Sequence, residues 1–490
     1  MARRRNPYPA LVIAALVPAV ALAGLWQFAD GQQPDAVDVS VTQPVSDTTA
    51  PTALPVLTTP LLSVRRAPSV LARQVNETAF VTALKPFVND IDSTSCFAVS
   101  VDGELVAQKN ETLPLRPASN VKLITASVAL EVLGPEFTYT TTIKGAVGAG
   151  GVVSGNLYFV GGGDPVLNSV WWNGPNTHYP PFNRTSMEAL ADSIKTSGVT
   201  SVTGSVVGDA SRYDGELYPP SWTSDVRFVD GGPVSALLAN DSRESASKAS
   251  QDPVVGAAAV LTTLLVERGI AVGTPPVAGI TPADAATITS IESLPLPAIL
   301  AEMLTTSDNS TAEMVLKEIG LKVSNSGTRI AGLAVLMSTM QSWGIPTAGI
   351  TLVDGSGLSD DDRLTCGALL AILQHASISD PVGAGLAVGG APGGTLYDTF
   401  LAGEALSGII RAKTGTLNNR ADGVTPDGKP GAKALSGFVP TDGGGVIEFS
   451  LLLNGQTISD DAEYQPIWKA MAEIFAKYPS GPTPADLGPR

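Results

Sequence analysis

The sequence predicts a mixed α/β (α+β) protein in which a mostly β module interrupts a larger domain. Strand-like segments and an apolar helix open the folded part of the chain, and helices followed by strands close it. Between them the chain changes to short strands separated by glycine turns. Polar motifs beginning at Ser119 and Ser307 stand on either side of this stretch, 188 residues apart (307 − 119). Because elements that meet at one site seldom need so long an excursion, we expect an inserted module at 140–285 within a discontinuous domain at 75–139 and 286–490.

The bulk composition excludes several classes of protein. The 490 residues, 44% of them hydrophobic, leave room for two or three domains with a substantial core. A net charge of −16, with no basic block after the N-terminus, argues against a nucleic-acid partner. The chain has two cysteines, which excludes cysteine-based zinc sites. Its two histidines give little support to a histidine-containing catalytic triad or a histidine metal site.

The N-terminus indicates export. Three arginines precede an almost wholly apolar run from Ala10 to Trp26, so we expect a signal peptide or membrane anchor at 1–28. The small residues Ala21 and Ala23 favour cleavage, whereas the length of the apolar run favours an anchor, and both remain open. Residues 29–74 are rich in Thr, Pro, Asp and Ser and are expected to form a flexible tether. In an oxidising compartment Cys96 and Cys366 can pair or remain separate buried thiols.

The remaining elements follow from periodicity and turn residues. A helix is expected at 71–87, and strands at 95–101 and 104–108 are joined by a turn at Asp102-Gly103. Within the expected insertion we predict strands at 139–144, 156–160 and 199–207, a segment leading out at 271–277, and helices at 186–196 and 254–267. After it we predict helices at 296–304, 312–319, 328–343, from 365 and at 462–478, and strands at 409–416 and 446–453.

The first candidate catalytic motif is Arg116-Pro-Ala-Ser-Asn-Val-Lys122. Ser119 and Lys122 are three residues apart, so on a helix they share one face. A serine hydroxyl becomes a good nucleophile when a partly desolvated lysine accepts its proton. The apolar residues that follow, from Leu123 to Leu133, would anchor such a helix. The same spacing recurs at Ser245 and Lys248, but no apolar helix follows there, and a solvated loop is expected.

Two further motifs follow in order, and the set of three is typical of penicillin-recognising serine enzymes. In Ser307-Asp-Asn309, the hydroxyl of Ser307 and the amide of Asn309 can pass a proton and hold substrate backbone, while Ser307 or Asp308 can also cap a helix. In Lys413-Thr-Gly-Thr416, the lysine and hydroxyls can attract a terminal carboxylate. Gly415 would let substrate backbone approach the strand closely.

Other glycine-rich stretches are weaker candidates. Gly161-Gly-Gly-Asp-Pro165 lacks the lysine and hydroxyl of a phosphate-binding loop and is expected to be a turn. Asp354-Gly-Ser-Gly357 is near a nucleophile elbow, but Asp354 and Leu358 stand where glycines should be. The acidic run Asp360-Asp-Asp362 is expected to be a solvated loop.

With these motifs the sequence resembles the low-molecular-mass class C penicillin-binding proteins, the D-alanyl-D-alanine carboxypeptidase/endopeptidase family (peptidase family S13). The resemblance covers roughly residues 75–478 and rests on the three motifs, the long insertion, and the 161–165 and 354–358 segments. It implies a transpeptidase/β-lactamase-like domain, with a five-stranded antiparallel sheet flanked by helices, interrupted by smaller domains of largely β character. The tether and the signal or anchor look like an actinobacterial secreted form.

The resemblance also implies the reaction. Ser119 would attack the carbonyl between two D-alanines of a peptidoglycan stem peptide or cross-link, and Lys122 would accept its proton. Ser307 and Asn309 would assist, while Lys413, Thr414 and Thr416 would position the carboxylate. The resulting acyl-enzyme would be hydrolysed by water, and β-lactam antibiotics would acylate Ser119 as inhibitors. No metal or organic cofactor is implied, the location would be extracytoplasmic, and only a possible N-terminal anchor would touch a membrane.

One departure and two rival functions stand beside this reading. After Thr416 the chain takes longer than is usual in the family to reach Ala434-Leu-Ser-Gly-Phe438, which puts carboxypeptidase against endopeptidase preference in doubt. A β-lactamase carries the same three motifs, but no glutamate-plus-asparagine motif of a class A deacylation loop lies between Ser307 and Lys413. The second rival is a catalytically silent wall-binding scaffold.

Overall fold

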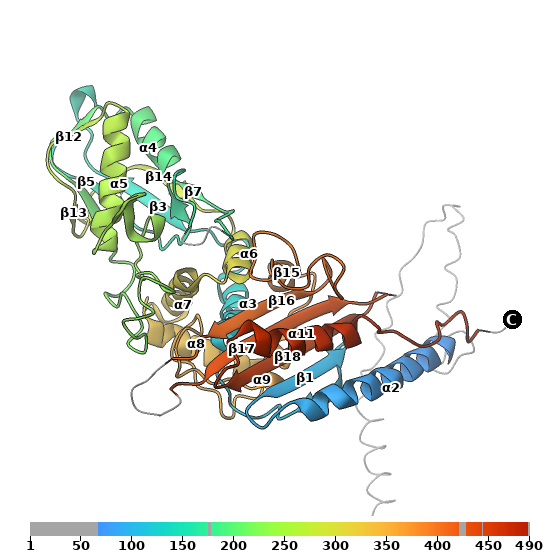
Figure 1. Ribbon diagram of the computed structural model, residues 1–490. Coiled ribbons are helices and arrows are strands. Elements are labelled where there is room, and N and C mark those ends of the chain that lie inside the picture. Colours follow the sequence, from blue (N-terminus) through green and yellow to red (C-terminus); the bar gives the residue numbers. More distant parts are fainter. Residues whose placement is uncertain (1–66, 175–177, 421–427, 443, 489–490) are drawn as a thin grey trace, which may run out of the picture. The chain divides into compact units, whose positions relative to one another are not determined.

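The computed structural model describes residues 67–174, 178–420, 428–442 and 444–488 (Figure 1). The segment predicted as signal or anchor, and most of the predicted tether, lie outside these residues. Helix α2 (Ala67–Asp90) begins inside the predicted tether, so residues 67–74 belong to a helix. In the described part of the chain, no helix has both the length and the apolar character needed to cross a bilayer.

The main sheet is antiparallel throughout and joins the two ends of the described chain. Its strands, in spatial order, are β15 (Ala387–Val388), β16 (Arg411–Leu417), β17 (Gly431–Pro440), β18 (Val446–Gly455), β1 (Cys96–Val101) and β2 (Glu104–Lys109). Strand β1 pairs with β18, with Cys96 opposite Leu452, which places the first hairpin beside the last strands. The five long strands match the expected sheet, and the short β15 adds a sixth at the edge.

Both faces of this sheet are buried, because successive residues of a strand point to opposite sides. In β1, Phe97 and Val99 pack with α2 and with α11 (Asp461–Phe475), which lies across the front of the sheet in Figure 1. Cys96 and Ala98 face the other core, which holds α3 (Val121–Leu133) and α9 (Cys366–His375). The first hairpin and both of these helices are confirmed near their predicted positions.

Three further helices enclose α3. They are α6 (Leu296–Thr306), α7 (Asn309–Ser324) and α8 (Arg329–Ser342). Asp308 caps α7 by accepting a hydrogen bond from the backbone N–H of Thr311, and Thr328 caps α8 in the same way through Ala331. All three helices agree with the predicted ranges, apart from an earlier start and a later end of α7.

The two cysteines form a disulfide between β1 and the first residue of α9. The Cα atoms of Cys96 and Cys366 are 5.9 Å apart, and 270 residues separate them along the chain. Both side chains are fully buried. Of the two alternatives that the sequence left open, a disulfide or two separate buried thiols, the structure has the disulfide.

The stretch between the first two motifs forms sheets of its own. Strands β13 (Val277–Ala278), β9 (Val206–Asp209), β5 (Leu157–Val160), β3 (Thr140–Lys144) and β14 (Thr287–Glu292) form a mixed sheet. A smaller parallel sheet holds β12 (Ala271–Val272), β8 (Ser201–Val202) and β4 (Val152–Val153). Helices α4 (Met187–Thr196) and α5 (Pro253–Glu267) pack on their common core.

Two predictions in this stretch were imprecise. The strand expected at 199–207 is divided into β8 and β9, because the chain turns at Gly204, where a Cβ atom would lie 2.7 Å from the backbone oxygen of Gly155. Strand β14 was not predicted, and its pairing with β3 carries the sheet to Glu292, past the expected limit at 285.

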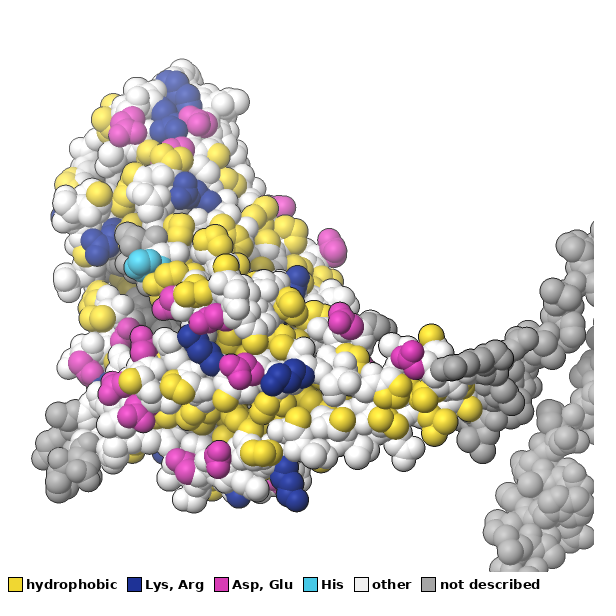
Figure 2. All heavy atoms as spheres, turned by 45° about the vertical axis from the view of Figure 1, so that its right-hand side comes forward, with side chains coloured by type: hydrophobic (Ala, Val, Ile, Leu, Met, Phe, Trp, Pro, Cys, Tyr) yellow, Lys and Arg dark blue, Asp and Glu magenta, His cyan; other side chains and the backbone are white. Residues whose placement is uncertain are grey.

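The surface carries charges of both signs. On the face seen in Figure 2, Lys and Arg side chains are scattered among Asp and Glu side chains and do not gather into a patch.

Candidate active site

Ser119 lies on a tight turn immediately before α3. This turn, η1 (Ala118–Asn120), is a 3-10 turn. The spacing of Ser119 and Lys122 had instead predicted that Ser119 lies in the first turn of the α-helix. Ala118 takes a left-handed conformation with φ of 48°. A Cβ atom at Gly357 would lie 1.8 Å from the carbonyl oxygen of Ala118. A glycine at 357 is therefore what allows this strained turn to be packed.

Gly415 on β16 serves the same turn from the other side. A Cβ atom there would meet the carbonyl oxygen of Pro117 at 2.9 Å and the Cβ atom of Ala118 at 3.0 Å. The expectation was that this glycine would admit substrate backbone. The close approach found in the structure is that of the turn carrying Ser119.

Lys122 brings the first two motifs together. Its Nζ donates hydrogen bonds to Oγ of Ser119 at 3.0 Å, to Oδ1 of Asn309 at 2.5 Å and to the carbonyl oxygen of Ser356 at 2.7 Å. Three acceptors around one ammonium group satisfy all of its N–H bonds. The predicted pair is therefore in contact, and Asn309 adjoins it although it is 187 residues farther along the chain.

Burial makes Lys122 easier to deprotonate than an exposed lysine. The side chain is fully buried, and this burial lowers the pKa of Lys122 to about 8. The carboxyl groups of Asp354, Asp308, Glu313 and Asp362 act in the opposite direction and raise the pKa. A lysine with a pKa near 8 can lose its proton at moderately alkaline pH and act as a base.

Asp354 supports the site from behind and was missed as a functional residue. Its carboxylate accepts hydrogen bonds from the backbone N–H groups of Ser356 (3.1 Å), Gly357 (2.6 Å) and Ser359 (2.8 Å), and from Nε1 of Trp222 at 2.8 Å. These bonds hold the loop whose Ser356 carbonyl contacts Lys122. The segment from Asp354 to Gly357 was noted in the sequence only because it is similar to a nucleophile elbow. Nothing in the sequence indicated that Asp354 is a buried hydrogen-bond acceptor.

The second motif occupies the joint between two helices. Ser307 ends α6 in a left-handed conformation with φ of 64°, Asp308 caps α7, and Asn309 is the first residue of α7. Nδ2 of Asn309 donates to the carbonyl oxygen of Asp230 at 2.6 Å, while its Oδ1 accepts from Lys122. The amide is thus oriented by one contact on each side, and the expected helix cap is confirmed at Asp308.

The third motif lies on β16, where its residues have different surroundings. Lys413 is fully buried, its Nζ donates to the carbonyl oxygen of Thr414 at 2.9 Å, and its burial holds its pKa well below the usual range. Thr414 donates to Oγ1 of Thr395 at 2.8 Å, and Thr416 is exposed.

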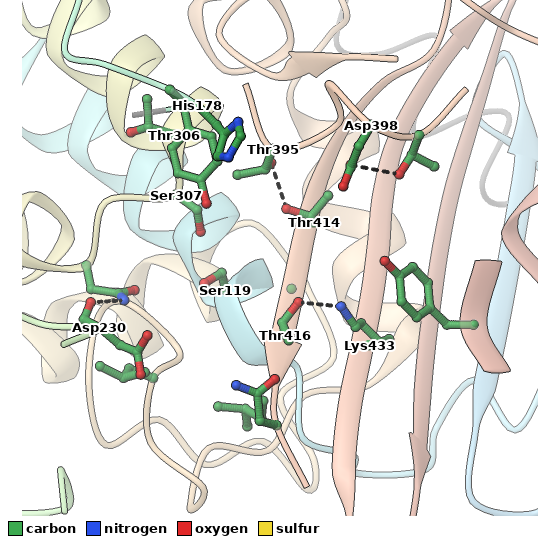
Figure 3. Close-up of a pocket in the computed structure, with 18 of the residues that line it drawn as sticks. Ser119, His178, Asp230, Thr306, Ser307, Thr395, Asp398, Thr414, Thr416 and Lys433 are labelled. Atoms are coloured by element: carbon green, nitrogen blue, oxygen red, sulfur yellow. Dashed lines mark hydrogen bonds between the residues drawn. The ribbon is translucent and has the colours of Figure 1, made fainter. Parts of the chain in front are cut away.

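These residues meet at a cavity of about 540 Å³. Among the predicted site residues, Ser119, Ser307, Asn309, Thr414, Gly415 and Thr416 line it, whereas Lys122 and Lys413 lie beneath its surface. Figure 3 shows Ser119 between Ser307 on one side and Thr414 and Thr416 on the strand opposite. The cavity wall also includes His178, whose ring stacks on Tyr397 with centroids 5.0 Å apart.

A segment between the first two motifs also touches the site. Besides the contact of Asp230 with Asn309, the backbone N–H of Gly232 donates to Oγ of Ser310 at 2.9 Å. Arg212 forms a bidentate ion pair with the buried Glu318 of α7. Residues between the first two motifs therefore hold the helix that carries Asn309.

The remaining motifs lie elsewhere or have structural roles. Ser245 and Lys248 face each other across an exposed two-stranded hairpin, not a loop. Gly161 to Gly163 form a buried segment without regular secondary structure after β5, where Cβ atoms would collide with neighbouring groups. The solvated loop expected at Asp360 to Asp362 is wrong for Asp362, which is fully buried. Its Oδ1 accepts a hydrogen bond from the backbone N–H of Val353 at 2.8 Å. Among the described residues, no cluster of histidine, cysteine and acidic side chains is arranged to hold a metal ion.

Comparisons with known proteins agree with this arrangement. The model of the D-Ala-D-Ala carboxypeptidase 3 (S13) family matches residues 90–246 and 239–478. A carboxypeptidase of Mycobacterium tuberculosis is 31% identical over 70% of this chain and 75% of its own length. Carboxypeptidase DacB of Mycolicibacterium smegmatis is 28% identical over 92% of this chain and 94% of its own.

The fold has a solved counterpart in penicillin binding protein 4 (dacB) of Haemophilus influenzae. That structure superimposes with a TM-score of 0.64 at 18% sequence identity, over 81% of this chain and 99% of that one. The family match spans most of the chain and includes all three motifs of the cavity. The chain therefore belongs to the D-Ala-D-Ala carboxypeptidase 3 (S13) family of serine hydrolases.

Proposed function

We propose that Ser119 is the nucleophile of a D,D-peptidase and that Lys122 is its general base. The observation that carries this assignment is the 3.0 Å contact between Nζ of Lys122 and Oγ of Ser119 at the floor of the cavity. A neutral Lys122 would accept the hydroxyl proton across the same contact. Asn309, held by Lys122 and Asp230, is then placed to bind substrate backbone.

We propose the following reaction, which this geometry supports. Oγ of Ser119 attacks the carbonyl carbon between two D-alanines, and its proton passes to Lys122. We propose that the backbone N–H groups of Ser119 and Thr416 stabilise the oxyanion. The C–N bond then breaks, the leaving amine takes a proton by way of Ser307, and water hydrolyses the acyl ester to regenerate Ser119.

The pH dependence of acylation tests the role of Lys122. The base must be neutral, and burial lowers its pKa to about 8, so the rate constant for acylation by a penicillin should rise with pH and reach half its maximum near pH 8. Stopped-flow measurements between pH 6 and 9.5 check this. A rate constant that stays flat over that range would rule out Lys122 as the titrating base.

We infer that β-lactams inhibit this enzyme by acylating Ser119. A structure of the Haemophilus influenzae penicillin binding protein 4 has been solved in complex with a β-lactam, and it superimposes on this chain with a TM-score of 0.58. A β-lactam presents a strained amide and a carboxylate, and the cavity places Ser119 beside the hydroxyls of Thr414 and Thr416.

We further propose that the enzyme is exported and acts on cell-wall peptidoglycan outside the cytoplasm. The disulfide supports an oxidising compartment. The N-terminal signal or anchor and the part of the tether before residue 67, which lie outside the described residues, remain predictions. We also propose that the long insertion forms an accessory module, and the pairing of β14 with β3 favours an end near Glu292 over 285.

The decisive experiment follows D-alanine release from a peptide that ends in D-Ala-D-Ala, with and without prior incubation with penicillin. We expect release by the untreated protein, none after incubation, and no rapid loss of the penicillin. Rapid hydrolysis of a chromogenic cephalosporin without peptide cleavage would replace the proposal with a β-lactamase. A protein inert toward both substrates would be the catalytically silent scaffold.

A further inference from the structure

Lys433 is a cation inside the active-site cavity that none of the three motifs contains. It lies on β17 directly opposite Thr416 of β16. Residues opposite each other on antiparallel strands point to the same face, so both side chains face the cavity that they line. Nζ of Lys433 donates a hydrogen bond to Oγ1 of Thr416 at 3.1 Å, the contact drawn in Figure 3.

Among the residues described, the ammonium group of Lys433 is held by contacts with uncharged groups and not by an ion pair. Nζ lies 4.1 Å from the centre of the Tyr464 ring, a distance typical of a cation–π contact. Within the described part of the chain, no carboxylate lies within ion-pair distance of Lys433. Burial lowers the pKa of Lys433, while the more distant carboxylates of Asp461 and Asp398 raise it. The cavity thus contains a partly desolvated positive charge whose partner is a neutral hydroxyl.

The other cations near the third motif are less suited to an incoming anion. Lys413 lies beneath the cavity surface and donates to a backbone carbonyl. Arg420 lines the cavity, but its guanidinium lies 3.5 Å from the Asp225 carboxylate and 3.7 Å from that of Asp360. Lys433 is therefore the best placed of the three to bind an anion beside Thr416.

We propose that Lys433 binds the substrate carboxylate on the carbon next to the leaving nitrogen. This inference rests on the proposed D,D-peptidase function and replaces Lys413, as the carboxylate-binding cation, with Lys433. Because Oγ1 of Thr416 accepts a hydrogen bond from Lys433, its own hydrogen remains free to donate to the same carboxylate. Lys433 is thus a substrate-binding residue that also orients Thr416.

The test compares two peptides that differ only at this carboxylate. One ends in D-Ala-D-Ala with a free carboxylate, and the other ends in D-alaninamide. We expect Lys433→Met to raise KM for the acid about 10- to 100-fold, as for the loss of a charge-assisted hydrogen bond, and to change kcat little. Its kcat/KM for the amide should stay close to that of the wild type, and Lys433→Arg should recover most of the preference for the acid.

Lys469→Met is the matched control. It also removes one lysine, but Lys469, which lies on α11, pairs with Glu404 and does not line the cavity. We expect wild-type kinetics from it with both peptides. An equal loss for acid and amide in Lys433→Met, or an unchanged preference for the acid, would overturn the proposal. A wild-type protein that cleaves neither peptide would contradict the D,D-peptidase function itself.

The wild-type enzyme supplies a second readout if Lys433→Met does not fold. The ratio of kcat/KM for acid to that for amide should fall as pH rises through the pKa of Lys433, which lies below 10.5. Taking the ratio removes the titration of Lys122, which acts equally on both peptides. A ratio that stays constant from pH 7 to above 10 would exclude the charge of Lys433 from carboxylate binding.

Discussion

Replacing Ser119 with alanine is expected to abolish both penicillin acylation and D-alanine release. The hydroxyl is the only atom group removed, and Lys122 keeps its contacts with Asn309 and the Ser356 carbonyl. Loss of a serine nucleophile commonly lowers kcat by about 10⁴-fold or more. Intact mass after incubation with penicillin should show one bound drug on the wild type and none on Ser119→Ala.

Ser127→Ala is the matched control for this prediction. Ser127 lies on α3, farther along the same helix, and its hydroxyl donates to the Leu123 carbonyl away from the cavity. It should be acylated like the wild type. A drug adduct of unchanged amount on Ser119→Ala would place the nucleophile on another residue and contradict the mechanism.

Removing the disulfide is expected to cause a large loss of stability. The bond closes a loop of 270 residues, and it joins β1 to α9 in the core that also holds α3. In the chain-entropy model a loop of this length contributes about 5–6 kcal/mol, so the double variant Cys96→Ser, Cys366→Ser should unfold at markedly lower denaturant concentration. Equilibrium unfolding in urea measures the difference.

Treatment of the wild type with a reductant distinguishes the effect of losing the disulfide on stability from the effect of the two serine substitutions. Reduced wild type should lose nearly as much stability as the double variant, and the double variant should not respond to the reductant. If the reduced and oxidised wild type unfold at the same urea concentration, the disulfide contributes little to stability, and any loss in the double variant comes from the buried serine hydroxyls.

Local patterns predicted the catalytic motifs and most of the helices and long strands. The hairpin around Asp102-Gly103, the helix after Ser119 and the helix around Trp468 were found because periodicity and turn chemistry act over a few residues. The very short strands β6 (Leu167–Asn168), β7 (Thr185–Ser186) and β15 were missed, because two residues cannot show a period.

The sequence by itself determined the family and the order of the three motifs, and it predicted the chemistry that we propose for Ser119 and Lys122, because these depend on residue type and short spacing. Tertiary structure alone decided that Cys96 meets Cys366, that Asp354 holds the loop behind Lys122, and that Lys433 enters the cavity while Lys413 lies beneath it. These contacts depend on strand register and on packing between segments far apart in the chain. No local period encodes such distances, so they become visible only when the chain is folded.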